Sequence, residues 1–464
     1  MITKPQLREY KENDVDTIHE YLRTCTSSHE ARFILENLGR LPSDFCGDVL
    51  IPYLRDSNRD TRFWAVKNLG KLEDAAYLPN LRDVATDDDS SIVRREAVSA
   101  IGRMRDKSAI PTLVKFLKDD DPNVVLQAMR ALFVFKSHDR VKECLLKLQS
   151  HPNEQIQYVL DMEFESKPGI TDYGMHYESP GWMKNVVVQG DTREVMRLLP
   201  DGCIHLTFTS PPYYNARDYS IYKSYQQYLD FLGEVFQAVH RITKEGRFLL
   251  INTSPVIVAR FSRKHSSRRY PIPFDLHSIV TQMGWEFIDD IVWAKPEVTV
   301  KNRNGGFQQH RKPLGYKPNM VTEYVMVYRK QTTRLLDWNM RQYPKSVIEK
   351  SKVRGQFETT NLWRIDPMSD KVHSAVFPHD LCDRVVKYYS FEGDLLFDPF
   401  AGSGTFGLAA RRHKRHFFLT EIKNEYVDRM KQTMSFINAK GLFTRFRTIE
   451  EIIEDMATVD RQTE

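Results

Sequence analysis

Two short motifs beyond residue 200 combine residue types that can do chemistry with a position where ligands usually bind. Ser-Pro-Pro-Tyr at 210–213 follows the apolar run IHLTFT at 204–209, and DPFAGSGT at 398–405 follows the apolar run LLF at 395–397. Runs rich in β-branched and aromatic residues predict strands. In a doubly wound sheet ligands bind at the carboxyl ends of strands, so we expect the two motifs to lie together in one site.

Taken alone, each motif has a less specific interpretation. Gly402, Gly404 and Gly407 satisfy GxGxxG, a dinucleotide pattern that is weak without further context. Ser-Pro-Pro-Tyr alone could form a polyproline II stretch that a small adaptor domain binds. The preceding strands, and the Ala-rich helical segment that begins near Thr405, favour a ligand site instead.

DPFAGSGT resembles the cofactor motif of the DNA amino-methyltransferases that use S-adenosyl-L-methionine. The resemblance implies that the glycine turn approaches the methionine part of the cofactor, and that Glu421, which ends the next strand, holds the two ribose hydroxyls. A carboxylate is a natural bidentate acceptor for a diol. VHSAVFPHDL at 372–381 is similar to the family's segment before the cofactor strand. The cofactor-binding residues implied are Phe377, Pro378, Asp398, Phe400, Gly402, Gly404, Thr405 and Glu421.

Ser-Pro-Pro-Tyr after a strand resembles the catalytic motif of the same family, which methylates an exocyclic amine of adenine or cytosine. The lone pair of such an amine is delocalised into the ring. The resemblance implies that Ser210 and the carbonyl of Pro211 accept its two N–H bonds and favour a tetrahedral nitrogen. Pro211 and Pro212 stiffen the turn, and Tyr213 stacks on a base that has left the duplex.

The expected reaction is a direct in-line methyl transfer to double-stranded DNA, without a covalent enzyme intermediate. In this family Ser at the first motif position accompanies cytosine N4 more often than adenine N6, so we expect a cytosine-N4 enzyme of a restriction-modification system, with adenine N6 as the alternative. Carbon-5 methylation needs a Pro-Cys nucleophile, and no cysteine follows a proline here. Methylation of RNA or of a protein amine, and a non-catalytic scaffold that senses the cofactor, remain open.

The order of the motifs resembles the permuted β class of amino-methyltransferases, in which the catalytic half precedes the cofactor half. Strand-like runs alternate with helical stretches, which predicts an α/β doubly wound, Rossmann-like domain at 185–464. IVWAKP at 291–296 and GDTREVMRLLPDG at 190–202 are further similarities to the class. Proline and glycine concentrate at 166–184, which we interpret as a linker.

The first 165 residues contain a repeated pattern. Ala31, Ala65, Ala97 and Ala128 fall in register in four segments that resemble HEAT repeats, and acidic turns such as DDDSS and DDDPN precede the later copies. We expect an all-α HEAT-like solenoid with these Asp residues as N-caps. An ordinary helical bundle is the alternative. Such an array could bind a protein partner or provide an additional DNA contact.

Basic residues concentrate in two segments of a chain whose formal net charge is only +5. Residues 295–354 hold 14 Lys and Arg against 4 Asp and Glu, and 260–269 hold five Lys and Arg and no acid. A local basic segment indicates a polyanion partner, although a solvated loop would have the same composition. We interpret approximately 295–360 as target recognition. The candidate DNA-binding residues are Arg260, Arg263, Lys264, Arg268, Arg269, Arg303 and Arg311.

Composition sets the remaining limits. With 464 residues the chain should form two or three domains, and it has no apolar run long enough to predict a membrane span. We expect no secretory signal and a cytoplasmic protein. The five dispersed cysteines suggest buried thiols rather than a metal site. His205 is interpreted as structural, and no metal site is predicted.

Overall fold

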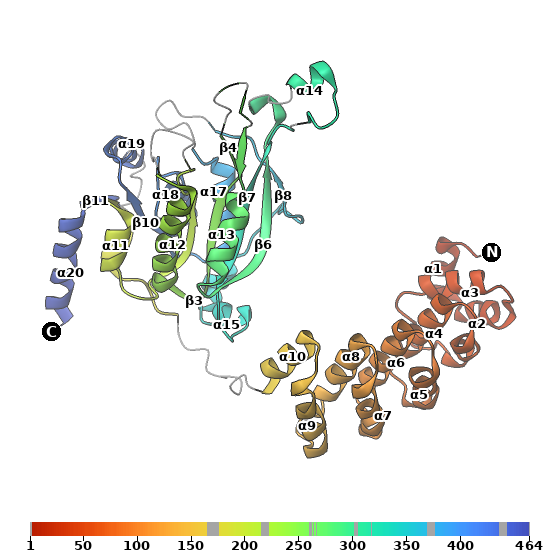
Figure 1. The fold of residues 1–464 in the computed structure, drawn as a ribbon. Coiled ribbons are helices and arrows are strands. Elements are labelled where there is room, and N and C mark those ends of the chain that lie inside the picture. Colours follow the sequence, from red (N-terminus) through yellow and green to blue (C-terminus); the bar gives the residue numbers. More distant parts are fainter. Residues whose placement is uncertain are drawn as a thin grey trace. The chain divides into compact units, whose positions relative to one another are not determined.

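The computed structural model divides the chain into two compact units, Met1–Ile170 and Thr171–Glu464 (Figure 1). Of the linker predicted at 166–184, residues 166–175 lie outside the described part. No helix among the described residues has the length and hydropathy needed to cross a membrane. Cys203 and Cys382 are buried thiols, as expected, whereas the other three cysteines are partly exposed. The described residues are 2–164, 176–214, 222–258, 262, 264, 265, 267–300, 305–316, 318–368, 376–435 and 443–463.

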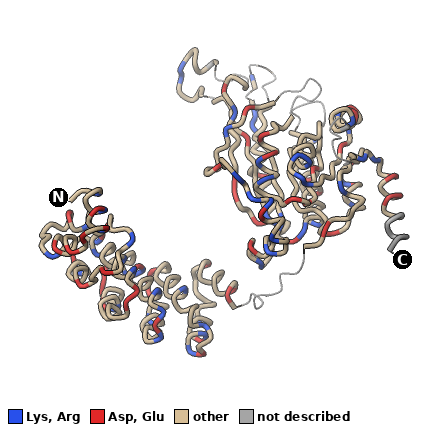
Figure 2. Tube along the Cα trace, turned by 180° about the vertical axis from the view of Figure 1, so that it is seen from behind, with Lys and Arg blue, Asp and Glu red and all other residues tan. Residues whose placement is uncertain are grey.

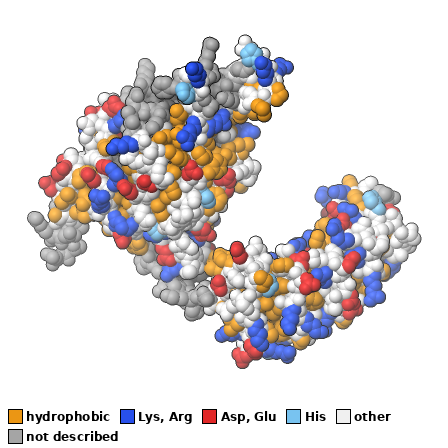
Figure 3. Space-filling view, in the orientation of Figure 1, with side chains coloured by type: hydrophobic (Ala, Val, Ile, Leu, Met, Phe, Trp, Pro, Cys, Tyr) orange, Lys and Arg blue, Asp and Glu red, His pale blue; other side chains and the backbone are white. Residues whose placement is uncertain are grey.

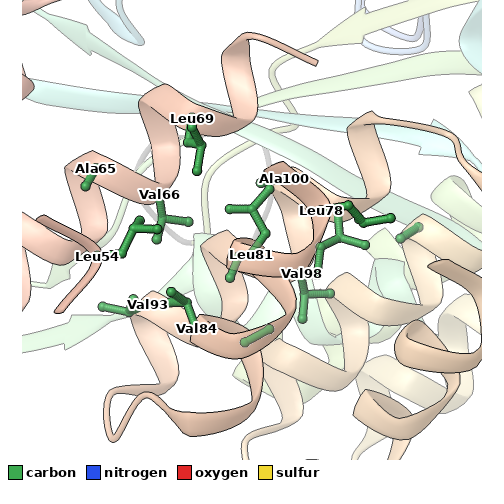
Figure 4. Close-up of a cluster of buried hydrophobic side chains, with 14 of the residues drawn as sticks. Leu54, Ala65, Val66, Leu69, Leu78, Leu81, Val84, Val93, Val98 and Ala100 are labelled. Carbon is green, nitrogen blue, oxygen red and sulfur yellow. The ribbon is translucent and has the colours of Figure 1, made fainter. Parts of the chain in front are cut away.

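The first unit is a stack of helix pairs (Figure 1). The repeated alanines Ala31, Ala65, Ala97 and Ala128 are fully buried, and Figure 4 shows part of the continuous core that the helices share. The α-helices are α1 Lys4–Asn13, α2 Val15–Thr24, α3 Ser28–Asn37, α4 Arg59–Lys71, α5 Leu78–Asp87, α6 Ser91–Arg103, α7 Ile110–Lys115, α8 Pro122–Phe133, α9 Asp139–Leu146 and α10 Glu154–Phe164.

Small residues set the spacing between successive repeats. A Cβ atom on Gly70 of α4 would lie 2.5 Å from the Cβ of Ala100 on α6, and one on Gly102 would lie 2.6 Å from the Cβ of Ala131 on α8. Real Cβ atoms do not approach so closely, so these positions require glycine. The small residues therefore let the second helix of one repeat pack against the second helix of the next.

The acidic turns do not act mainly as N-caps, which corrects the sequence-based expectation. Of the aspartates in these turns, Asp121 does cap its helix, accepting from the amide of Asn123. Asp88 instead accepts a hydrogen bond from the amide of Ser90. It also forms an ion pair with Arg62 of the preceding repeat, with a nitrogen–oxygen distance of 2.7 Å. The corresponding residue Asp119 binds Arg94 in the same way, at 2.9 Å. These two carboxylates therefore link repeats rather than satisfy helix N-termini.

The second unit is built on a nine-stranded sheet of order β11-β1-β10-β9-β2-β3-β7-β6-β8. All neighbours are parallel except β7, which is antiparallel to β3 and β6. Every apolar run interpreted as a strand forms one; the short strands β8 and β11 and a separate hairpin, β4–β5, were not predicted. The strands are β1 Val186–Gln189, β2 Ile204–Thr209, β3 Thr243–Thr253, β4 Val256–Val258, β5 Arg268–Tyr270, β6 Trp285–Ala294, β7 Thr322–Lys330, β8 Leu362–Arg364, β9 Leu395–Asp398, β10 His416–Glu421 and β11 Arg445–Thr448.

Helices cover both faces of this sheet, as predicted. Alternate strand residues point to opposite faces: Val186 and Val188 join one core, and Val187 joins the other. The first core contains α11 Thr192–Leu198, α12 Tyr225–Ile242, α13 Ile272–Thr281 and α20 Ile449–Thr463; the second contains α17 His379–Tyr389, α18 Thr405–Arg412 and α19 Asn424–Ser435. The remaining α-helices are α14 Gly305–His310, α15 Leu336–Arg341 and α16 Lys345–Ser351.

A buried polar network joins the amino ends of β2, β3 and β9. Arg247 donates to the carboxylate of Asp394 and to the carbonyl of His205, and Tyr343 donates to Asp394. Burial alone would raise the pKa of Asp394, but the Arg247 guanidinium, His205 and the Tyr343 hydroxyl hold it at about 2. The network therefore contains a buried ion pair, Arg247 with Asp394, in which each charge is compensated by the other.

His205 belongs to this network, which supports its structural interpretation. Its ring lies within reach of His176 and Asp394, and the three could offer ligand atoms within 4.8 Å of one another. However, Nδ1 of His205 accepts the amide of Leu395 at 3.0 Å. The neutral ring must then carry its proton on Nε2, the atom that faces the other two residues, so this geometry does not suit a metal ion.

We predict that Asp394→Asn lowers the free energy of unfolding by about 3–5 kcal/mol, because the substitution leaves the Arg247 charge buried without a counter-ion. Chemical denaturation of the variant at neutral pH measures the loss. Asp337→Asn is the matched control, since its pair with Arg341 is exposed and should contribute no more than about 0.5 kcal/mol. Equal losses in the two variants would contradict the assigned role.

Candidate active site

Parallel pairing of β2 with β9 brings the two motifs together. Leu206 pairs with Leu396 and Thr207 with Phe397, so the turn after each strand leaves the same carboxyl edge of the sheet. Across that edge the hydroxyl of Thr209 donates to Asp398 at 2.6 Å. Both turns therefore face one site, although nearly two hundred residues separate them in the sequence.

A cavity of about 320 Å³ opens between the two turns. This volume lies within the range of sites for small molecules and cofactors. All four residues of the first motif, Ser210 to Tyr213, line the cavity, and so do Phe377, Phe400, Gly402, Thr405 and Glu421 of the predicted cofactor set. Further residues that line the cavity were not predicted individually; they are Gly190, Asp191, Thr192, Arg193, Tyr222, Phe231, Val376, Pro399, Ala401, Ser403, Ile422, Lys423 and Tyr426.

The glycine turn holds Glu421 at the cavity wall. Gly402 and Gly404 have φ angles of +54° and +77°, in the left-handed region where other residues are strained. The Gly402 amide donates to Oε2 of Glu421 at 2.8 Å, and the Lys423 amide donates to Oε1 at 2.9 Å. Burial raises the pKa of Glu421, and these two amides oppose that effect. Each oxygen keeps a lone pair, so the carboxylate can accept from a diol.

Three residues of the predicted cofactor set do not line the cavity in the described part of the chain: Pro378, Asp398 and Gly404. Pro378 precedes the first turn of α17 as its N-cap. Asp398 is buried behind the turn, where it accepts from Thr209 and from the Phe400 amide at 3.0 Å. Burial raises its pKa to about 7. Gly404 packs against the side chains of Met430 and Met434, with no room for a Cβ.

A further carboxylate, which the sequence motifs did not indicate, lies beside the Ser210–Tyr213 turn. Glu323 on β7 accepts the Tyr213 hydroxyl at 3.1 Å and the side-chain amide of Asn252 at 2.8 Å, both on Oε2. Lys295 pairs with Oε1. The sequence pattern that could have pointed to Glu323 is the segment IVWAKP, which contains Lys295. Glu323 itself lies 28 positions later in the chain, so the segment does not identify it.

The β4–β5 hairpin brings basic residues close to the catalytic motif. Arg268 and Arg269, expected in a loop, lie on β5 and are exposed. The guanidinium of Arg268 lies 4.9 Å from the ring centre of Tyr270. The Tyr270 ring in turn lies 4.8 Å from that of Tyr214, the residue after the motif. The hairpin is thus joined to the catalytic turn through aromatic contacts.

Of the other DNA-binding candidates, Lys264 and Arg311 are among the described residues. Lys264 is exposed, and Arg311 is exposed directly after α14. Figures 2 and 3 show Lys and Arg gathered around α14. Arg260, Arg263 and Arg303 lie outside the described residues. In the segment 295–360 interpreted as target recognition, residues 322–330 form β7, which pairs within the sheet between β3 and β6.

Comparisons with known proteins match the two units of the chain to two different families. Residues 204–432 match a family model described as DNA methylase, and 15–102 and 88–159 match HEAT repeats. The type II β methyltransferase M.BslI of Bacillus sp. (strain NEB-606) is 26% identical over 255 residues, which cover 52% of this chain and 26% of that protein. The type II methyltransferase M.Cfr9I of Citrobacter freundii is 27% identical over 273 residues, covering 52% of this chain and 84% of that protein.

Among solved structures, a DNA modification methylase from Thermus thermophilus aligns with 26% identity and a TM-score of 0.45, over 57% of this chain and 99% of that chain. The matched family confirms the predicted cofactor class, S-adenosyl-L-methionine, and the HEAT match confirms the repeats. Residues 204–432 therefore belong to the N6/N4 DNA methylase family, in a chain whose N-terminal unit is built from HEAT repeats.

Proposed function

We propose that this protein transfers the methyl group of S-adenosyl-L-methionine to cytosine N4 of a flipped base in double-stranded DNA. The observation that carries the proposal is the single cavity lined by both the Ser210–Tyr213 turn and the Gly402 turn. The resemblance of Ser-Pro-Pro-Tyr to cytosine-N4 motifs favours cytosine, and adenine N6 is the second candidate.

The residues present fit this cofactor. The glycine turn and Thr405 form one wall of the cavity, and Glu421 offers two acceptor oxygens for the ribose. Phe377 is held in place by its stack on Phe208, with ring centres 4.6 Å apart. When bound, the cofactor supplies an electrophilic methyl group on a sulfonium.

On the opposite wall, Ser210 and the carbonyl of Pro211 would accept the two N–H bonds of the target amine. Tyr213 would stack against the base, since an enzyme that acts on a base must take it out of the duplex. Catalysis in this arrangement rests on positioning the amine against the methyl group. The protein would act in restriction-modification, with the HEAT array available for a further partner or DNA contact.

The reaction is tested by incubating the protein and labelled cofactor in parallel with mixed-sequence duplex DNA, with RNA and with a protein mixture, then digesting the DNA and identifying the modified nucleoside. We expect the modified nucleoside to be N4-methyldeoxycytidine. Recovery of N6-methyladenine would move the assignment to the second candidate, and label in RNA or protein alone would contradict a DNA substrate.

Ser210→Ala should lower turnover by about 10²-fold or more, because one acceptor for the amine is lost, while cofactor affinity stays within about twofold. Ser278→Ala, at an exposed position of α13, is the control. Steady-state methylation and calorimetric cofactor titration separate the two effects. Equal losses in turnover and affinity would contradict the role of Ser210, and a wild type as inert as Ser210→Ala would favour a cofactor-sensing scaffold.

Glu421→Gln should weaken cofactor binding by about tenfold or more, because hydrogen bonds to a charged acceptor contribute about 1.5–3 kcal/mol each. DNA affinity should change little. Isothermal calorimetry measures the first and fluorescence anisotropy the second. Glu425→Gln, which is exposed on α19 outside the cavity walls, serves as the control; unaltered cofactor binding in Glu421→Gln would remove this residue from the cofactor site.

Replacing both Arg268 and Arg269 with Ala should lower the slope of log affinity for DNA against log salt concentration by about two units, because each lost phosphate contact removes about one. DNA titrations between low and moderate salt give the slope. Lys431→Ala, exposed on α19, controls for net charge. A slope that does not change would exclude the hairpin from phosphate contact.

A further inference from the structure

The proposed reaction leaves a proton that Ser210 cannot keep. When a neutral amine gains a methyl group, its nitrogen becomes cationic and must release one N–H proton. A serine hydroxyl can pass a proton on, but it is too weak a base to hold one. The chain should therefore contain a route from Ser210 to a group that can accept a proton at neutral pH.

The contacts around Tyr213 provide such a route. Ser210 lies in the same turn as Tyr213 and lines the same cavity, and the Ser210 and Ser254 side chains oppose the rise in the Tyr213 pKa. Tyr213 in turn donates to Oε2 of Glu323 at 3.1 Å. Burial, together with the nearby Glu323 charge, raises the pKa of Tyr213, so the phenol stays protonated and can relay a proton without losing one permanently.

Glu323 is held where a terminal acceptor should be. Asn252 donates to its Oε2 and Lys295 pairs with its Oε1, so the carboxylate has a fixed orientation. The side chains of Glu323 and Lys295 are 16% and 18% exposed. Water can therefore reach this end of the route, and a proton delivered there can leave without crossing the cavity.

Three other acidic groups near the cavity are less suitable. Asp191 caps α11 and pairs with Arg193. Asp398 accepts from Thr209 and from the Phe400 amide, behind the glycine turn. Glu421 accepts from the Gly402 and Lys423 amides on the cofactor side. Among the described residues, Glu323 is the carboxylate that accepts from Tyr213, which shares a turn with Ser210.

We infer that Glu323 is the terminal proton acceptor of methyl transfer, reached through Ser210 and Tyr213; this inference rests on the proposed function. As the N–C bond forms and the S–C bond breaks, the amine proton moves to Ser210 Oγ, the Ser210 proton to Tyr213 Oη, and the Tyr213 proton to Glu323 Oε2. Ser210 and Tyr213 end neutral, as they began. Glu323 gains one proton and returns it to solvent.

The test is a double-mutant cycle on the rate of methyl transfer, measured in single-turnover experiments with the full-length protein. Glu323→Gln keeps an oxygen acceptor for Tyr213 but cannot take a proton, and Tyr213→Phe keeps the ring but breaks the route. Each should slow methyl transfer by about 10²-fold or more, while Kd for cofactor and for DNA stays within about threefold. The double variant should be no more than about threefold slower than the slower single variant, because both changes break one chain.

Tyr158→Phe is the control: this tyrosine is exposed on α10, away from the cavity lining, and its rate should remain within about threefold of wild type. Losses that multiply in the double variant, or a Glu323→Gln enzyme that transfers methyl at the wild-type rate, would overturn the relay. Weaker cofactor and DNA binding without slower chemistry would show a structural role and would also overturn it. An inert wild type would instead overturn the proposed function, and the relay with it.

Discussion

The pairing of β2 with β9 is the constraint on which the site depends. Only two residue pairs, Leu206 with Leu396 and Thr207 with Phe397, join these strands in register. A slip of one residue would point their side chains to the opposite faces of the sheet. Polar contacts at both ends of so short a pairing therefore matter more than they would beside a long strand.

Those contacts lie at opposite edges of the sheet and differ in kind. At the amino edge, the His205 ring accepts the Leu395 amide, and Arg247 joins the His205 carbonyl to the Asp394 carboxylate. At the carboxyl edge, Thr209 donates to Asp398. The first is a buried charge network that is costly to break; the second is one hydrogen bond beside the cavity. The charge network thus lies at the end of the pairing that is remote from the cavity.

Sequence patterns were sufficient for the parts whose signal is local. The apolar runs before Ser210 and before Asp398 predicted strands, and the repeated alanines predicted stacked helices. Both predictions use a residue pattern that is visible within a short stretch of sequence. The prediction that the acidic turns act as N-caps was wrong for Asp88 and Asp119, because their partners are arginines from the preceding repeat. A local capping rule contains no information about a neighbour some 25 residues away.

The group that the sequence could not indicate is Glu323. It reaches the catalytic turn because β7 runs antiparallel between β3 and β6, which places Glu323 opposite Trp293 and near Asn252. No motif marks that register. Conversely, β8 and β11 were missed because their sequences, LWR and RFRT, contain arginines and are not apolar runs, unlike β1 and β9, which are also short.

The same strand explains why the charge count of 295–354 overstates its basic surface. Lys295 pairs with Glu323, and Arg329 donates to the Gly246 carbonyl from a buried position. Lys330 donates to the carbonyls of His240 and Thr243. These cations satisfy backbone and carboxylate groups within the second unit. A cation used in this way offers little to a phosphate, whereas Arg311 is exposed directly after α14.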